Sequence, residues 1–132
     1  MEAKVVWQKE KLKFTGHIEG SPDIFMDSES GPTPMELVLV ALGGCTGMDI
    51  ISILQKMRQD VKNFEINLLA ERANEHPKVF TKINLEYVVY GTNIDENAVK
   101  RAIELSQEKY CSVGGMLKKA VELTYSYKII NE

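Results

Sequence analysis

The feature that most constrains this chain is an uncharged run from Leu37 to Met48, inside a longer segment of helical character, residues 34–57. A helix that is apolar on every side has to be enclosed, because any side facing water would expose apolar surface. Gly43, Gly44 and Asp49 interrupt the segment too often for a membrane span. One sheet covers only one side of such a helix. We therefore predict a homodimer with this helix near its centre; the alternative is a monomer whose smaller helices cover the second side.

Local signals indicate where this helix begins. Thr33 is a suitable N-cap, Pro34 suits the first helical position, and Glu36 stands where a capping box requires it. The simplest role of Glu36 is therefore to cap its own helix. In a straight helix Glu36 and Cys45 lie on opposite faces, about 13 Å apart along the axis. Glu36 could therefore reach only the Cys45 of a second copy, in an antiparallel helix pair.

Alternation of apolar and polar residues predicts strands on both sides of the long helix. One-sided alternation is typical of antiparallel sheets with one face in water. We expect a single α+β domain over residues 1–132, in which one antiparallel sheet of about six strands covers one side of the long helix. Two amphipathic helices are predicted to pack on this sheet. The predicted strands cover residues 5–7, 12–18, 24–26, 64–70, 79–89 and 121–129, and the smaller helices cover residues 95–109 and 112–120.

Composition excludes several classes of protein. The formal net charge is −3, with 16 basic and 19 acidic residues, so the chain lacks the basic excess of a nucleic-acid binder. The start of the chain has no apolar signal-peptide segment, and two cysteines are too few for a secreted disulfide scaffold. No spacing of Cys and His matches a metal site, and no motif indicates a cofactor. We expect a cytoplasmic protein that binds neither nucleic acid nor membrane.

The residues with the clearest chemical potential are Cys45, in the uncharged helix, and Cys111, just before the last predicted helix. An isolated buried cysteine usually serves as a small apolar side chain. Two cysteines can form a redox pair only if their Cα atoms lie within about 7 Å of each other, and their spacing in the sequence leaves that open. A helix N-terminus lowers the pKa of a nearby thiol, so we expect a lowered pKa at Cys111. Asp49, one turn after Cys45, is expected to be structural or linked to solvent.

Three segments resemble those of OsmC-like proteins, relatives of the organic hydroperoxide resistance proteins: Gly31-Pro32-Thr33-Pro34-Met35-Glu36-Leu37, Gly43-Gly44-Cys45 and Lys109-Tyr110-Cys111-Ser112-Val113. The resemblance implies an intertwined homodimer in which antiparallel sheets wrap the long central helices of the two copies, with the active site at the subunit interface. It also implies that Cys45 attacks an organic hydroperoxide, that Cys111 resolves the product, and that a lipoyl-type dithiol restores both thiols. By the same resemblance, Glu36 is a candidate for the glutamate at the start of the catalytic helix.

Two departures from the family pattern leave alternatives open. Peroxidase members hold the thiolate with an arginine from the N-terminal strands, yet residues 1–57 contain no Arg, and only lysines such as Lys9, Lys11 and Lys13 offer a positive charge there. The family's glutamate corresponds either to Glu36 or to the position of Met35. Two functions therefore remain: a thiol-dependent organic hydroperoxide reductase, or a non-enzymatic redox sensor or small-molecule binder that uses the same interface pocket.

Overall fold

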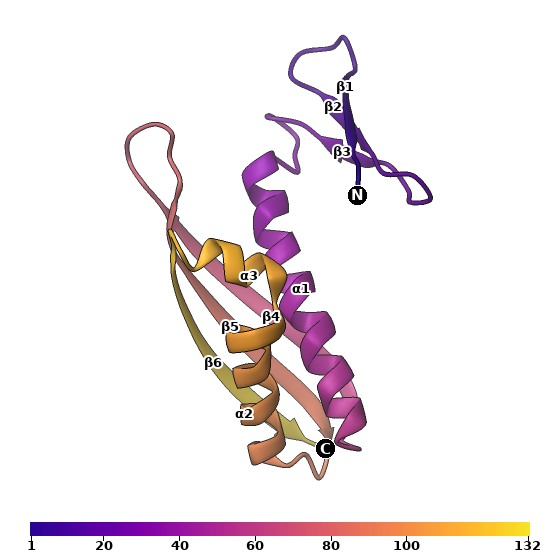
Figure 1. Cartoon of the computed structure of the whole chain (residues 1–132), viewed down its shortest axis with the longest axis vertical. Coiled ribbons are helices and arrows are strands. Elements are labelled where there is room, and N and C mark those ends of the chain that lie inside the picture. The colour runs from indigo at the N-terminus through magenta and orange to yellow at the C-terminus, as the bar shows by residue number, and fades with distance from the viewer. The chain divides into compact units, whose positions relative to one another are not determined.

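The computed structural model describes all 132 residues and divides them into two compact units, Met1–Val38 and Leu39–Glu132. Helices and two three-stranded sheets make up the fold (Figure 1), which confirms the predicted α+β class. The strands form two separate sheets, one in each unit, rather than a single sheet of six. The expected single domain over residues 1–132 stays a prediction.

The first unit is a small antiparallel sheet in the order β1-β2-β3. Strand β1 (Lys4–Trp7) pairs with β2 (Phe14–His17), which pairs with β3 (Ile24–Met26). All three strands lie where the alternation predicted them. Several large apolar side chains of this sheet remain exposed, because the unit has too few residues to cover both faces of its own sheet. They are Val5, Trp7, Ile24 and Phe25.

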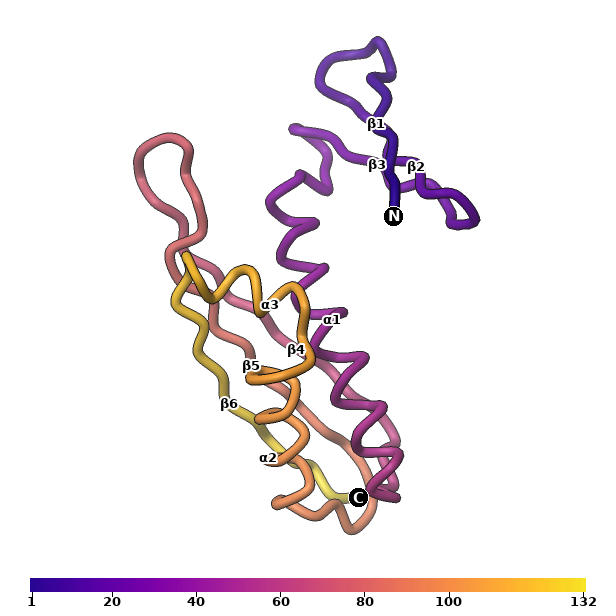
Figure 2. The backbone as a smooth tube through the Cα atoms, viewed as in Figure 1, coloured from indigo at the N-terminus to yellow at the C-terminus, as the bar shows by residue number.

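The second unit places helices against one face of the sheet β4-β5-β6 (Figure 1). The unit boundary falls within the long helix α1, which matches the predicted helix closely. The smoothed trace in Figure 2 follows the chain from α1 into β4 and β5, then through the helical region that includes α2 and α3 into β6. The elements are α1 (Pro34–Lys56), β4 (Asp60–Arg72), β5 (Phe80–Thr92), α2 (Glu96–Leu105), the π-helix η1 (Ser106–Tyr110), α3 (Ser112–Leu117) and β6 (Glu122–Asn131).

Strand β6 corrects the expectation of purely antiparallel sheets. β4 and β5 pair antiparallel, as predicted, with Leu68 opposite Leu85. β6 instead pairs parallel with β5, with Tyr125 opposite Leu85. Two parallel neighbours need a crossover connection long enough to return the chain to the same end of the sheet. The segment α2-η1-α3 provides that crossover, so the second sheet is mixed.

Small residues allow α1 to lie close to β4. A β-carbon at Gly43 would stand 3.0 Å from Leu68 Cδ1, and one at Gly47 would stand 3.1 Å from Ile66 Cδ1. Glycine at these positions therefore removes the atoms that would hold the helix away from the strand. The resulting core combines side chains from α1, β5 and α2. Its members include Leu42, Ile50, Leu54, Ile83, Leu85, Val89, Val99, Ala102 and Ile103.

The opposite side of α1 is left uncovered by this single chain. Val40 is 66% exposed and Met48 is 77% exposed. An 18-residue window of α1 has a mean hydropathy of 2.1 and only 28% of it is buried, so by length and composition alone the helix could cross a membrane. The core helix of a soluble protein meets the same criterion. The monomer alternative required the smaller helices to cover this second side of α1, and they do not.

Candidate functional site

The two cysteines are neighbours in the second unit, although they are far apart in the sequence. Cys45 lies on α1 and is half-buried, and Cys111 caps the N-terminus of α3 and is only 5% exposed. Both are free thiols. Cys45 raises the pKa of Cys111, and Thr46, which follows Cys45, lies 2.7 Å from Ser106, whose carbonyl oxygen accepts from the Cys111 N–H. The fold thus brings together the two segments that carry the cysteines.

The environment of Cys111 favours the protonated thiol. The pKa of Cys111 is raised from 9.0 to about 11, chiefly by burial and to a smaller extent by interactions with Cys45 and Asp49. Its Sγ accepts a hydrogen bond from the Gly114 N–H at 3.3 Å, which lowers the pKa but is outweighed by burial. The expectation of a lowered pKa at this helix N-terminus is therefore wrong. α3 has a single N–H aimed at the sulfur, and that one donor does not offset the loss of water.

A cluster of polar side chains, the polar cluster, lies beside the thiols and was missed by sequence reasoning. It consists of Thr46 and Asp49 on α1, Tyr87 on β5, and Ser106 and Gln107 on η1. Thr46 Oγ1 lies 2.8 Å from Tyr87 Oη and 2.7 Å from Ser106 Oγ. Ser106 Oγ donates to Asp49 Oδ2 at 2.9 Å, and Gln107 Nε2 donates to Tyr87 Oη. Every buried side-chain nitrogen and oxygen in the structure has a hydrogen-bond partner.

Two residues of this cluster carried a usable signal in the sequence. Thr46 is a hydroxyl residue inside the uncharged run, and Ser106 lies on the apolar face of the helix predicted at residues 95–109. Both are fully buried. A buried hydroxyl needs a hydrogen-bond partner, so two such residues on apolar faces predict a buried polar contact. The π-helix that carries Ser106 had no comparable signal.

Burial also controls the titration of Tyr87 at the centre of the polar cluster. Loss of water raises the pKa of Tyr87 above 10.0, while hydrogen bonds to Thr46 and Gln107 act in the opposite direction. The Tyr87 ring is stacked on Phe64 of β4, with ring centroids 6.3 Å apart. The hydroxyl is therefore held as a neutral hydrogen-bonding group.

Glu36 caps the helix, as the capping box predicted. Its Oε1 accepts from the Thr33 N–H at 3.0 Å, and its own N–H donates to Thr33 Oγ1 at 3.3 Å. The hydrogen bond from the Thr33 backbone is the main reason that the pKa of Glu36 is lowered. Glu36 is exposed and takes no part in the polar cluster. Its family role at the thiol stays a prediction.

A groove of about 580 Å³ lies next to the cysteine site in the second unit. Asp49, which belongs to the polar cluster, and Tyr110, which precedes Cys111, both line it. Most of the other walls are apolar, with Lys56 the one basic residue among them. The complete set of lining residues is Met48, Asp49, Ser52, Ile53, Lys56, Met57, Leu105 and Tyr110.

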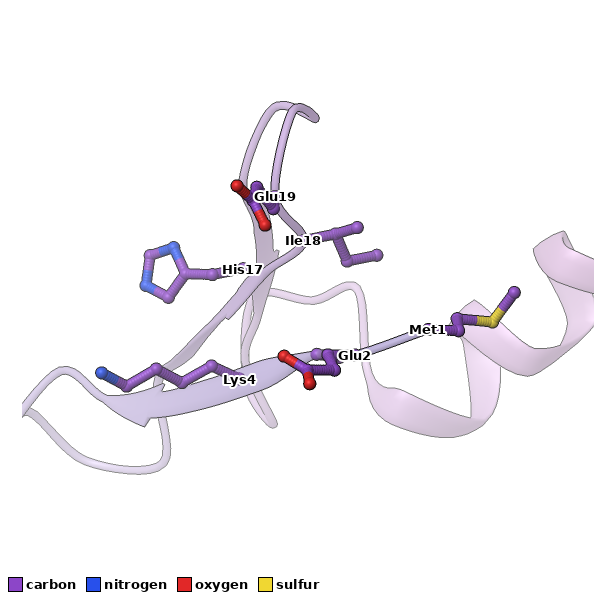
Figure 3. Close-up of a pocket in the computed structure, with 7 residues that line it drawn as sticks. Met1, Glu2, Lys4, His17, Ile18 and Glu19 are labelled. Carbon is purple, nitrogen blue, oxygen red and sulfur yellow. The ribbon is translucent and has the colours of Figure 1, made fainter.

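Another cavity lies in the first unit and has a volume of about 770 Å³ (Figure 3). Charged side chains from one end of the β1-β2 pair, where Lys4 is the partner of His17, border it, including Lys4 and Glu19. His17, which also lines it, pairs with Asp23 at 2.7 Å. None of the candidate site residues lines this cavity. No group of three or more His, Cys, Asp or Glu side chains in the structure is arranged to hold a metal ion.

Comparison with known proteins identifies a protein family, a relative of similar sequence and solved structures that this chain resembles. A family model described as OsmC-like protein matches residues 27–126. Protein YhfA of Escherichia coli K12 is 50% identical over 133 residues, covering 98% of each chain. The crystal structure of a hypothetical protein from Aquifex aeolicus VF5 is 37% identical, with a TM-score of 0.91 over 99% of this chain and 96% of that one. OhrB of Bacillus subtilis, an organic hydroperoxide resistance protein, shares the fold at 16% identity, with a TM-score of 0.67 over 97% and 98% of the two chains.

Proposed function

Because this chain belongs to the OsmC-like protein family, we propose that it reduces organic hydroperoxides with the thiols of Cys45 and Cys111. Membership of the family supports a redox or peroxide-stress role in general. The specific activity rests on one observation, that Ser106 joins the segment carrying Cys45 to Cys111, so that the two thiols lie on neighbouring segments. Of two neighbouring free thiols, the half-buried one can be oxidised by a peroxide to a sulfenic acid, and the other can then form a disulfide with it.

The proposed cycle uses the two thiols in sequence. The Cys45 thiolate attacks the terminal peroxide oxygen of ROOH; the O–O bond breaks, and the alkoxide takes up a proton to leave as ROH. Cys45 is then a sulfenic acid. The Cys111 sulfur attacks the sulfenic sulfur, and its proton leaves with the OH group as water, so that a Cys45–Cys111 disulfide forms. An external dithiol of the lipoyl type reduces this disulfide by exchange and becomes a cyclic disulfide itself.

The surroundings of the thiols support an organic rather than an inorganic peroxide. The neighbouring groove is lined mainly by apolar side chains, among them Met48, Leu105 and Tyr110. An apolar wall stabilises the alkyl part of a bound organic hydroperoxide, whereas hydrogen peroxide has no alkyl group that such a wall could stabilise. We infer that the R group of the substrate occupies this groove while the O–O bond lies at Cys45.

The high pKa of Cys111 favours a second candidate function, a non-enzymatic redox sensor. A thiol whose pKa is raised to about 11 is almost wholly protonated at neutral pH, so its attack on a sulfenic acid is slow. A sensor tolerates a slow step, because it reports oxidation without turning over. A small-molecule binder at the same groove would need no thiol reaction at all.

One assay on the wild-type protein separates these functions. We expect a catalytic amount of protein, mixed with tert-butyl hydroperoxide and dihydrolipoamide, to consume many equivalents of peroxide, and to consume hydrogen peroxide more slowly. Mass spectrometry of the oxidised protein should show an internal disulfide, two mass units below the reduced chain. An internal disulfide without turnover would replace the reductase by the sensor. Peroxide loss equal to that in the protein-free mixture, with no change in protein mass, would remove both redox functions.

We also propose that the chain is a homodimer in the cytoplasm, in which a second copy covers the exposed side of α1. OsmC and Ohr family proteins are known as dimers and are typically soluble. Val40 and Met48 present apolar surface on the uncovered side of the helix, and such surface favours association. Gly44 lies on the same exposed side and would permit close approach of a second helix.

Light scattering should give twice the mass of one chain at micromolar concentration. The variant Met48→Glu should give the mass of a single chain, because it places a charge where the second copy is expected to pack. Leu69→Glu is the matched control: Leu69 is 76% exposed, but it points away from α1, since its neighbour Leu68 faces the helix. This variant should remain dimeric. A single-chain mass for the wild type would contradict the proposal.

A further inference from the structure

We propose that Ser106 is a positioning residue that sets the separation of the Cys45 and Cys111 sulfurs. The inference rests on the proposed function in one respect, that the two thiols form a disulfide. It adds a residue outside the thiol pair, on the π-helix η1, whose side chain and backbone connect the two cysteine-bearing segments. No other residue of the polar cluster bonds to both segments.

The side chain of Ser106 holds the segment of α1 that carries Cys45. Its Oγ lies 2.7 Å from Thr46 Oγ1 and 2.9 Å from Asp49 Oδ2. Thr46 follows Cys45 directly, and Asp49 lies one helical turn further on. Because these two partners are three residues apart on α1, the two hydrogen bonds fix the rotation of α1 as well as its distance from η1.

The backbone of Ser106 holds the other cysteine. The Cys111 N–H donates to the Ser106 carbonyl oxygen at 2.8 Å. This bond spans five residues, which makes it the bond of a π-helix and not of an α-helix. The extra residue per turn lets the chain leave η1 at Cys111 and begin α3 there, with Cys111 as its N-cap. Ser106 therefore bonds both to the segment of α1 that carries Cys45 and to Cys111.

The directions of the hydrogen bonds leave Ser106 a single arrangement. A serine or threonine hydroxyl has one proton to donate. Because Ser106 donates to Asp49, Thr46 has to donate to Ser106, and Tyr87 has to donate to Thr46. Gln107 then donates to Tyr87. Four bonds run in one direction and end on a carboxylate, so the Ser106 side chain cannot rotate without breaking both bonds that its hydroxyl makes.

Fixed geometry of this kind has a measurable effect on disulfide formation. Two thiols held at the correct separation form a disulfide more readily than two thiols that must first be ordered, and a small displacement of reacting groups costs a large factor in rate. A residue with a merely structural role would stabilise the reduced and oxidised proteins equally. A positioning residue stabilises the oxidised form more, and so changes the disulfide equilibrium itself.

The test compares Ser106→Ala with the wild type in buffers of reduced and oxidised glutathione. Mass spectrometry gives the fraction of Cys45–Cys111 disulfide, and hence its equilibrium constant; the rate of closure is measured separately with diamide, which takes up the two hydrogens. We expect Ser106→Ala to lower the equilibrium constant about 10-fold or more, because two side-chain hydrogen bonds are lost. The matched control is Thr124→Val, which removes a comparable bond to Asn84 between β6 and β5 and should leave the constant unchanged.

Two further variants keep the test decisive if Ser106→Ala does not fold. Thr46→Val removes one of the two bonds to α1, and we expect a fall of about 2- to 12-fold, equivalent to one hydrogen bond. Thr46→Ser retains the hydroxyl and should restore the wild-type constant.

An equilibrium constant within twofold of the wild type in Ser106→Ala, or in Thr46→Val, would overturn the positioning role. A wild type that forms the disulfide but does not turn over peroxide would remove the reductase and leave Ser106 to be judged by these constants alone. A wild type that forms no internal disulfide would overturn both proposals.

Discussion

Replacing Cys45 by serine should abolish hydroperoxide reduction, with a fall in peroxide consumption of about 1,000-fold or more, as expected when a nucleophile is removed. A serine hydroxyl occupies nearly the same space as the thiol, so the fold should persist. It is not ionised at neutral pH and cannot form the sulfenic acid that the cycle needs. The measurement is the initial rate of tert-butyl hydroperoxide loss in the presence of dihydrolipoamide.

The matched control for this experiment is Cys111→Ser. This variant retains the attacking thiol and should consume one equivalent of peroxide, after which Cys45 remains as a sulfenic acid that dimedone traps. A Cys45→Ser protein that consumes peroxide as fast as the wild type would contradict the assignment of the attacking thiol. A Cys111→Ser protein that turns over with dihydrolipoamide at the wild-type rate would show that Cys111 is not needed to resolve the product.

The second large effect concerns the reactivity of Cys111. Its thiol should react with iodoacetamide about 100-fold more slowly at pH 8 than an ordinary cysteine, because a pKa raised from 9.0 to about 11 leaves about 100-fold less thiolate. The single-thiol variant Cys45→Ser isolates this reaction. Burial, the main cause of the shift, persists in it, so the rate should still rise with pH beyond 9.0.

Urea supplies the control, because unfolding exposes Cys111 and should return alkylation to the ordinary rate. Asp49→Asn should accelerate the reaction of the folded protein, since it removes a charge that raises the pKa.

The same shift in the pKa of Cys111 predicts how the free energy of unfolding depends on pH. The unfolded chain releases the Cys111 proton near pH 9.0 and the folded chain only near 11, so this thiol lowers the free energy of unfolding as the pH rises between those values. An alkylation rate that levels off below pH 9 would contradict the raised pKa.

Local sequence signals predicted the elements that depend on local physics. The cap at Thr33 and Glu36 places the start of α1, and both backbone hydrogen bonds of the capping box are present as expected. Helical spacing also predicted α2, for which Asp95 serves as N-cap through a hydrogen bond from the Asn97 N–H. These features involve residues two to four positions apart, and their energies follow from the residues alone.

The features that the sequence did not reveal depend on contacts between distant segments. The pKa of Cys111 is governed by burial, and burial is set by packing that no local signal describes. The polar cluster joins α1 and η1 through Thr46 and Ser106, and only the folded sheet and helices bring those residues together. The parallel pairing of β6 likewise depends on the path of the crossover, whereas alternation indicates only which face of a strand is buried.

The parallel partner of β5 has a consequence for the order in which the protein is assembled. A ribosome makes β4 and β5 first, and these can pair at once as a hairpin. The other edge of β5 then stays open until the whole crossover and β6 have been made, and an open edge is a template for pairing with other chains. Cys111 lies within that crossover, so the second sulfur reaches its place only as the crossover docks on the hairpin. Nascent chains should therefore be more vulnerable to aggregation and oxidation than the finished protein.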